Sequence, residues 1–254
     1  MRKFFAISGL AMMMLLGACD VSAQGAGARD QKGLKDAYKE YFTVGVAVNM
    51  RNVSNPDQIA LIKQNYNSMT AENDMKPGSL QPREGQFNWG NADKIANFCR
   101  ENGIKLRGHC LCWHAQFADW MFEGENGEPA SKELFYERLR THIHAVVNRY
   151  KDIVYAWDVV NEAIAGADYD RDGYYDLQTA SHGEANCFYW QDYLGSEDYI
   201  RIVVGKARKY FAEYGGNPSD LKLFINDYNL ESWWDGNKKL KSLIHWINVW
   251  ESDG

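Results

Sequence analysis

An amide and a carboxylate stand side by side at the end of one apolar run. Residues 153–160 are nearly all apolar, the pattern of a strand buried on both faces of a parallel sheet, and Asn161 and Glu162 follow directly. Residues at the carboxyl ends of such strands form the active sites of β/α barrels, so Glu162 is a candidate general acid. An acid beside an amide suits the hydrolysis of a polysaccharide. The alternative is a solvated glutamate in the loop after the strand.

A second polar group lies at the end of the expected strand 66–72. Glu72, Asn73 and Lys76 offer an acceptor, an amide and a cation at close spacing, a set suited to holding sugar hydroxyls. The alternative is the start of a helix with a solvated Glu–Lys pair four residues apart, worth only about 0.2–0.5 kcal/mol.

Composition favours one sizeable domain that acts on a neutral partner. The chain has 254 residues, of which 45% are hydrophobic, enough for a substantial core. Its formal net charge of −6 and the lack of a basic stripe argue against nucleic acid as a partner. Aromatic residues make up 14%, and their flat apolar rings suit sugar faces as well as cores.

The elements that must position these residues alternate between strand and helix. Strands are expected at 42–48, 66–72, 105–113, 153–160 and 221–228. Helices are expected from Asn55 and Pro56 onward and at 92–102, 131–150, 196–214 and 238–250. This alternation predicts an α/β fold with a parallel sheet and helical crossovers.

Four stretches together resemble glycoside hydrolase family 10, the endo-β-1,4-xylanases. They are NSMTAENDMK (67–76), RGHCLCWH (107–114), YAWDVVNE (155–162) and FINDYN (224–229), in the family's order. The likeness runs from about residue 40 to the end of the chain. It implies a (β/α)8 TIM barrel, incomplete here with about the first five βα units, that hydrolyses internal bonds of xylan or xylo-oligosaccharides with retention of anomeric configuration.

The resemblance implies a role for each matching residue. Glu162 would be the acid/base, and Asn161 would hydrogen-bond the 2-hydroxyl of the sugar at the cleavage point. The further substrate-binding residues would be Glu72, Asn73, Lys76, His109, Trp113, Gln116, Asn226 and Tyr228. A histidine on a buried strand can also be a core residue, and His114 fits that description.

One half of the retaining mechanism has no match in the sequence. The family carries its nucleophile in a Thr-Glu-Leu-Asp-like motif on the seventh strand, after a Gln-x-His pair on the sixth, and neither occurs here. The chain ends at Gly254, after the helix that follows the fifth expected strand. We therefore expect the front part of an enzyme, either a truncated frame, a fragment or a barrel interrupted by an inserted module, that is inactive by itself.

The first residues look like an export signal. Residues 1–24 begin with a positive charge and continue with an apolar stretch, as a signal peptide does. The sequence LGAC at 16–19 resembles a lipobox, which would lipidate Cys19 and anchor the protein to a membrane, whereas VSA at 21–23 resembles an ordinary cleavage site. We favour the lipoprotein type.

The rest of the chain follows as a short tether and the enzyme domain. Residues 25–29 are expected to form the tether, and 30–254 the partial barrel. This layout predicts a bacterial protein that is extracytoplasmic, at the outer cell surface or secreted, and monomeric.

The remaining four cysteines do not suggest a metal site. Cys99, Cys110, Cys112 and Cys187 form no CxxC pair and lack the spacing of a zinc finger, so buried free thiols are expected. Cys110 and Cys112 would face the same way on one strand, which disfavours a bond between them.

One acidic stretch has a partial calcium motif. Asp168, Asp170, Asp172 and Gly173 match the opening of an EF-hand loop, but Thr179 stands where a bidentate glutamate belongs. We favour a solvated loop over the active site, with calcium binding as the alternative, and expect no cofactor and no metal.

Two other classes of protein remain possible readings of the sequence. A non-catalytic surface glycan-binding lipoprotein would keep the aromatic residues without a carboxylate pair, and a surface interaction protein would need neither. Trp233 and Trp234 could stack on sugars or pack against a neighbouring loop.

Overall fold

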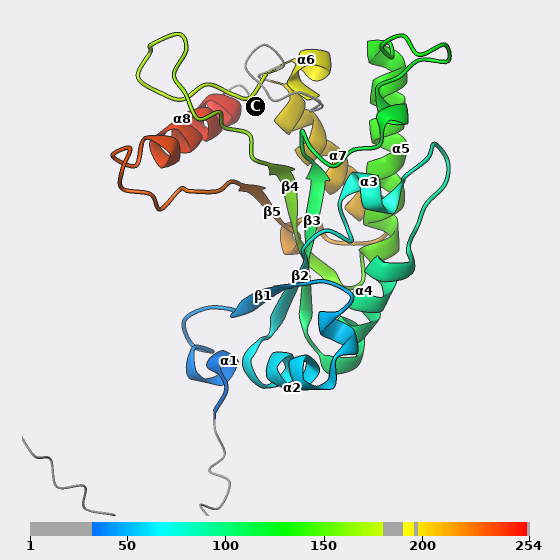
Figure 1. Cartoon of the computed structure of the whole chain (residues 1–254), viewed down its shortest axis with the longest axis vertical. Helices are drawn as coiled ribbons and strands as arrows, with labels where there is room; N and C mark the ends of the chain where they lie inside the picture. The colour runs from blue at the N-terminus through cyan, green and yellow to red at the C-terminus, as the bar shows by residue number, and fades with distance from the viewer. Residues whose placement is uncertain (1–31, 180–189, 196–197, 253–254) are drawn as a thin grey trace, which may run out of the picture. The chain divides into compact units, whose positions relative to one another are not determined.

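Five parallel strands pair in chain order in this computed structural model, which describes residues 32–179, 190–195 and 198–252 (Figure 1). The strands are β1 (Gly45–Val48), β2 (Ser68–Ala71), β3 (Lys105–Cys112), β4 (Val154–Asn161) and β5 (Lys222–Asn226). All five expected strands are confirmed, each within a few residues of its expected bounds. The order of five parallel strands joined by helices is that of consecutive βα units.

The main helices are α2 (Pro56–Asn65), α4 (Gly90–Asn102), α5 (Lys132–Tyr150), α7 (Tyr199–Glu213) and α8 (Lys238–Ser252). Local capping fixes several of their ends. The side chain of Asn55 accepts the first free N–H groups of α2, and Ser131 Oγ does the same for α5. Gly103 ends α4 with φ 63°, a left-handed conformation that glycine adopts readily. These helices confirm the expected ones.

Several short elements were not foreseen from the sequence. They are α1 (Leu34–Ala37), η1 (Asn52–Ser54), α3 (Pro77–Leu80), η2 (Asp119–Met121), α6 (Trp190–Leu194) and η3 (Pro218–Asp220). None of the helices in the described part of the chain is long and apolar enough to cross a membrane.

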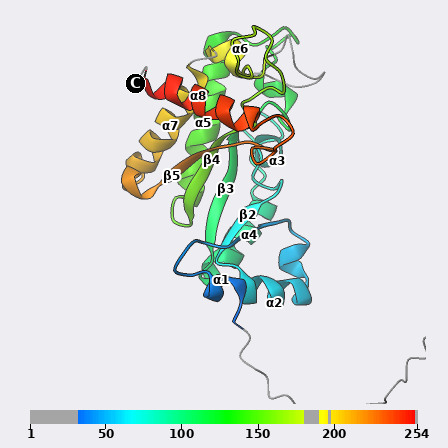
Figure 2. The same ribbon diagram turned by 90° about the vertical axis from the view of Figure 1, so that its left-hand side faces the viewer.

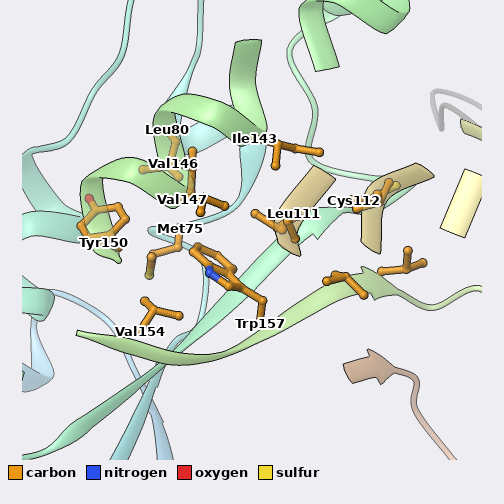
Figure 3. Packing of buried hydrophobic residues seen from close by; sticks show 14 of the residues in the cluster. Met75, Leu80, Leu111, Cys112, Ile143, Val146, Val147, Tyr150, Val154 and Trp157 are labelled. Carbon is orange, nitrogen blue, oxygen red and sulfur yellow. The ribbon is translucent and has the colours of Figure 1, made fainter. Parts of the chain in front are cut away.

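The core lies between the sheet and the helices on one of its faces (Figures 1 and 2). The indole of Trp157, only 1% exposed, packs among Leu111 of β3 and the α5 residues Val146 and Val147 (Figure 3). Gly108 on the neighbouring strand makes room for this ring, because a Cβ there would lie 2.2 Å from its carbon atoms. This packing fixes β3 and β4, the strands that carry the acid and its neighbours.

The opposite face of the sheet is polar. Arg107 lies 4.5 Å from the centre of the Phe224 ring, and Lys105 Nζ lies 5.4 Å from that of Tyr155. A hollow on this face is lined in part by Gly45, Ala47, Ser68, Thr70, Arg107 and Tyr155.

The expected free thiols are confirmed for Cys99, Cys110 and Cys112, which are buried and unbonded. Burial raises the pKa of the Cys99 thiol to about 12, and the pKa values of Cys110 and Cys112 are raised as well. The strand that carries the last two is irregular, with a cis peptide between His109 and Cys110 and a register shift. Cys187, Cys19, the leader and the tether lie outside the described residues.

Candidate active site

The ends of β4 and β5 place the amide and the carboxylate. Asn161 is the last residue of β4 and is in register with Asn226, the last of β5. Glu162 comes next, with φ 54°, and its N–H donates to the carbonyl of Asn226 at 2.7 Å. The left-handed backbone turns the chain sharply at the edge of the sheet, as expected where a strand passes into an active-site loop.

The Glu162 carboxylate is held from two sides. Trp113 Nε1 donates to Oε2 at 2.9 Å, and the side-chain amide of Asn161 donates to Oε1 at 3.3 Å. His114 Nε2 stands 4.0 Å from Oε2, and the Glu162 side chain is 24% exposed. A carboxyl group that is oriented by donors yet reachable from solvent can exchange a proton with a bound molecule.

Asn161 is fixed in turn by the next strand. Its Oδ1 accepts a hydrogen bond from Asn226 Nδ2 at 2.7 Å, and the residue is only 4% exposed. With its oxygen engaged, the amide of Asn161 must direct its N–H groups toward Glu162. The side chain of Asn226 therefore orients the Glu162 carboxyl group indirectly, through Asn161.

Lys76 connects the second strand to the same group. Its Nζ donates to Asn73 Oδ1 at 2.9 Å and lies 4.4 Å from the centre of the Trp113 ring. Lys76 is 7% exposed, so its charge is compensated by these contacts and not by bulk water. Asn73, Lys76, Trp113, Glu162, Asn161 and Asn226 thus form one connected set, which we call the Glu162 network.

His109 belongs to a separate group on the same sheet. Its Nδ1 lies 2.9 Å from Asp158 Oδ2, and Arg107 contacts the other oxygen of the same carboxylate. Asp158 is 2% exposed and faces His109 directly in the strand register. A buried carboxylate that is also held by the Arg107 guanidinium orients the imidazole, so His109 is positioned and not a simple core residue.

Besides His109, three expected binding residues lie apart from the Glu162 network. Glu72 is exposed, with Asn49 Nδ2 3.5 Å from its Oε2. Gln116 is exposed, has φ 53°, and holds the N–H of Gly78 with its carbonyl oxygen. Tyr228 is 52% exposed and carries Lys239 Nζ 3.4 Å from its ring centre.

Two more residues lie beside Glu162: Asp227, which matches a supporting position of the family, and Gln178, which sequence reasoning missed. Asp227 is paired with Lys239 at 2.7 Å and also accepts the N–H of Ile164 at 3.1 Å. Burial raises the pKa of Asp227 above its usual range, against the opposing effect of the ammonium group. Gln178 Nε2 donates to the Glu162 carbonyl at 2.9 Å. Asp227 adjoins a residue singled out from the sequence, whereas no local pattern marks Gln178.

The acidic loop differs from the pattern read in the sequence. Carboxylate oxygens of Asp168, Asp170 and Asp176 lie within 4.8 Å of one another, so Asp176 stands where Asp172 was considered. Lys238 Nζ pairs with Asp168 at 2.6 Å and lowers the pKa of that carboxyl group. The protein itself therefore supplies a cation to this loop.

Comparisons with known proteins agree with this arrangement. A model for glycosyl hydrolase family 10 matches residues 33–254. An endo-1,4-beta-xylanase/feruloyl esterase of Xylanibacter ruminicola is 63% identical over 159 residues, 61% of this chain and 22% of that protein. Endo-1,4-beta-xylanase A of Halalkalibacterium halodurans is 41% identical over 209 residues, 78% of this chain and 47% of that protein.

The solved structures give the same result. A psychrophilic glycoside hydrolase family 10 endo-beta-1,4-xylanase is 44% identical with a TM-score of 0.71, and the match covers 87% of this chain and 63% of that one. The chain spans less than two thirds of each of these three proteins. Its five parallel strands correspond to part of the family's (β/α)8 barrel. Since the family match runs through all five strands and the whole Glu162 network, the chain belongs to glycosyl hydrolase family 10.

Proposed function

We propose that this protein is an endo-1,4-β-xylanase that hydrolyses internal β-1,4-xylosidic bonds of xylan with retention, and that Glu162 is its acid/base. The observation that carries the proposal is the Glu162 carboxyl group, part-exposed at the end of β4 and oriented by Trp113 and Asn161. Relatives named endo-1,4-beta-xylanases support the substrate class. The same names give no support to a non-catalytic glycan-binding protein.

Glu162 would act in both steps of the reaction. In the first, its proton passes to the glycosidic oxygen as the bond from C1 to that oxygen breaks, and a second carboxylate forms a bond to C1. In the second, Glu162 takes a proton from water, whose oxygen displaces that carboxylate from C1 and leaves the anomeric configuration unchanged. A sugar alkoxide is a poor leaving group, so protonation of the glycosidic oxygen is essential.

Asp158 and Asp227 are the buried carboxylates nearest to Glu162 along β4 and β5. Neither is suited to attack the anomeric carbon. Both oxygens of Asp158 are engaged by His109 and Arg107, and both oxygens of Asp227 by Lys239 and a backbone N–H. Because both oxygens of each carboxylate are held in ion pairs or hydrogen bonds, neither group is free to move onto the anomeric carbon. We therefore assign the attacking role to neither of them.

The substrate would contact the polar side chains along this edge of the sheet. Asn161 is assigned the 2-hydroxyl at the cleavage point, because its N–H groups already point toward Glu162. The other assigned contacts are Glu72, Asn73, Lys76, His109, Trp113, Gln116, Asn226 and Tyr228. Neither a cofactor nor a metal is assigned a role in the reaction.

We also propose an extracytoplasmic location. Residues 1–24 would direct export, Cys19 would carry a lipid, and residues 25–29 would tether the domain, which works as a monomer. A polymer too large to enter a cell must be met outside it, so an exported enzyme fits the substrate.

Xylan hydrolysis by the full-length protein tests the function. We expect reducing ends to appear with a mixture of oligosaccharides, and NMR of the first product to show the β-anomer. Glu162→Gln should abolish this activity, whereas Glu101→Gln, an exposed position near the end of α4, should keep it. Absence of xylan hydrolysis by the unaltered protein with its nucleophile-bearing segment present would refute the proposal.

A further inference from the structure

The backbone of Glu162 adopts a conformation that needs support. Its φ of 54° lies in the left-handed region, which costs a residue with a Cβ roughly 1 kcal/mol or more unless the surroundings hold it. The N–H is held by the Asn226 carbonyl at 2.7 Å. The carbonyl oxygen is held by Gln178 Nε2 at 2.9 Å. The two hydrogen bonds therefore hold the peptide groups on both sides of the Glu162 Cα.

Gln178 reaches this position because the loop after β4 doubles back on itself. Its own N–H donates to the Ala163 carbonyl at 2.9 Å, and Ile164 and Leu177 form an isolated antiparallel bridge. Gln178 also lines the small hollow that contains Trp113 and Glu162. The Gln178 side chain therefore comes from the returning segment of this loop, which lies directly beside Glu162.

Contacts with α8 hold the loop in place. Ser242 Oγ accepts the N–H of Tyr175 at 2.7 Å, and Trp246 Nε1 donates to the Tyr175 carbonyl at 3.0 Å. Tyr174 stacks on His245 with ring centres 4.0 Å apart. Figure 1 shows α8 beside this loop, and the hydrogen bonds of Tyr175 with Ser242 and Trp246 join the two. Gln178 thus extends from a braced segment and not from a free loop.

We propose that Gln178 is a positioning residue for Glu162, holding its peptide so that the carboxyl group points at the glycosidic oxygen. The inference rests on the proposed acid/base role of Glu162. Without the amide donor, the Glu162 carbonyl is free to turn and the carboxyl group shifts with it. Such a shift of the carboxyl group reduces proton transfer strongly, because the acid must lie within hydrogen-bond reach of the glycosidic oxygen.

The test is Gln178→Met in the full-length protein, which keeps the length of the side chain and removes the donor. We expect kcat on xylan to fall about tenfold while KM changes less than about twofold. The kcat/KM on an aryl β-xylobioside with an acidic phenol should fall less than about threefold, because that leaving group needs little protonation. Gln86→Met, at an exposed position, is the matched control and should behave as the parent.

Two further variants keep the test decisive. If Gln178→Met does not fold, Gln178→Asn, whose amide is one methylene short, should show the same dependence on the leaving group. Gln178→Lys, which retains an N–H donor at similar reach, should recover at least half of the parent's kcat on xylan. Equal losses on both substrates, or no loss on xylan, would refute the positioning role.

The outcomes separate this inference from the proposed function. If Glu162→Gln abolishes xylan hydrolysis while Gln178→Met matches the parent, only the role of Gln178 fails. If Glu162→Gln remains active on xylan, the acid/base assignment itself fails.

Discussion

The indole N–H of Trp113 donates a hydrogen bond to Glu162 Oε2 at 2.9 Å across a sequence separation of 49 residues. The same ring carries Lys76 Nζ 4.4 Å from its centre. Trp113 follows β3, Lys76 follows β2 and Glu162 follows β4, so one indole joins the ends of three neighbouring strands. The acid is therefore positioned by the sheet as a whole.

Replacing the acid should affect substrates according to their leaving groups. We expect Glu162→Gln to remove nearly all activity on xylan and to impair kcat/KM on aryl glycosides with acidic phenols far less, because a sugar alkoxide needs a proton and a stabilised phenolate does not. Steady-state kinetics on both substrates measure this difference. Equal losses would contradict an acid role.

Removing the indole donor should weaken proton transfer without unfolding the protein. Trp113→Phe keeps an aromatic ring beneath Lys76 but leaves Glu162 Oε2 without its N–H donor, so we expect roughly a tenfold loss of kcat on xylan. Trp120→Phe is the matched control, because its indole donates to the Gln81 carbonyl instead of to Glu162. A similar loss in both variants would show that the effect is not specific to the acid.

A buried histidine should make stability depend on pH. His142 is fully buried beside Gln81 and Phe87, and burial lowers its pKa from 6.5 to about 4. Below pH 6.5 the unfolded chain binds a proton that the folded protein resists, so the free energy of unfolding falls as pH drops toward 4 and then levels off. The full loss is about 3 kcal/mol.

The comparison that checks this is between two destabilised variants. In urea unfolding at pH 7, 5.5 and 4.5, His142→Asn should lose this part of the pH dependence, whereas Ile143→Val, a core change on the same helix without a titratable group, should retain it. If the free energy of unfolding changed with pH equally in both variants, the argument from the burial of His142 would be contradicted.

The contact between Gly108 and Trp157 should be sensitive to a single methyl group. A Cβ at Gly108 would lie 2.2 Å from the indole, so Gly108→Ala should lower the free energy of unfolding by about 2–4 kcal/mol. Gly205 lies in α7 with open space around its Cα, and Gly205→Ala should stabilise by about 0.5–1 kcal/mol. Thermal unfolding measures both changes. A change in stability of the same sign in the two variants would be inconsistent with this packing.

The lipoprotein proposal has a direct cellular test. Cys19→Ala should move the protein from the membrane fraction to the soluble fraction, because the modified thiol would be its only proposed anchor. Immunoblots of fractionated cells report the change. A variant that stays with the membrane as the parent does would show that the anchor lies elsewhere or that Cys19 is not lipidated.

Local pattern was enough to predict the five strands and the main helices, and to place Glu162 directly after a strand. The apolar run at 153–160 followed by Asn161 and Glu162 predicted a strand with functional groups at its end, and the structure has β4 ending at Asn161. Asn55, Gly103 and Ser131 marked helix ends correctly, because caps depend on residues within one turn of each other. Such features are encoded by neighbours in the chain.

Only the tertiary structure decided which side chains meet. The pairing of His109 with Asp158, the bond from Trp113 to Glu162, and the grip of Gln178 on the Glu162 carbonyl depend on the register of parallel strands and on a loop that doubles back. Register is set by packing around buried groups such as Trp157, which contacts residues far apart in the sequence. The sequence therefore determined the chemical groups and the strand ends, while long-range packing determined their contacts, because no local pattern specifies how separate strands align.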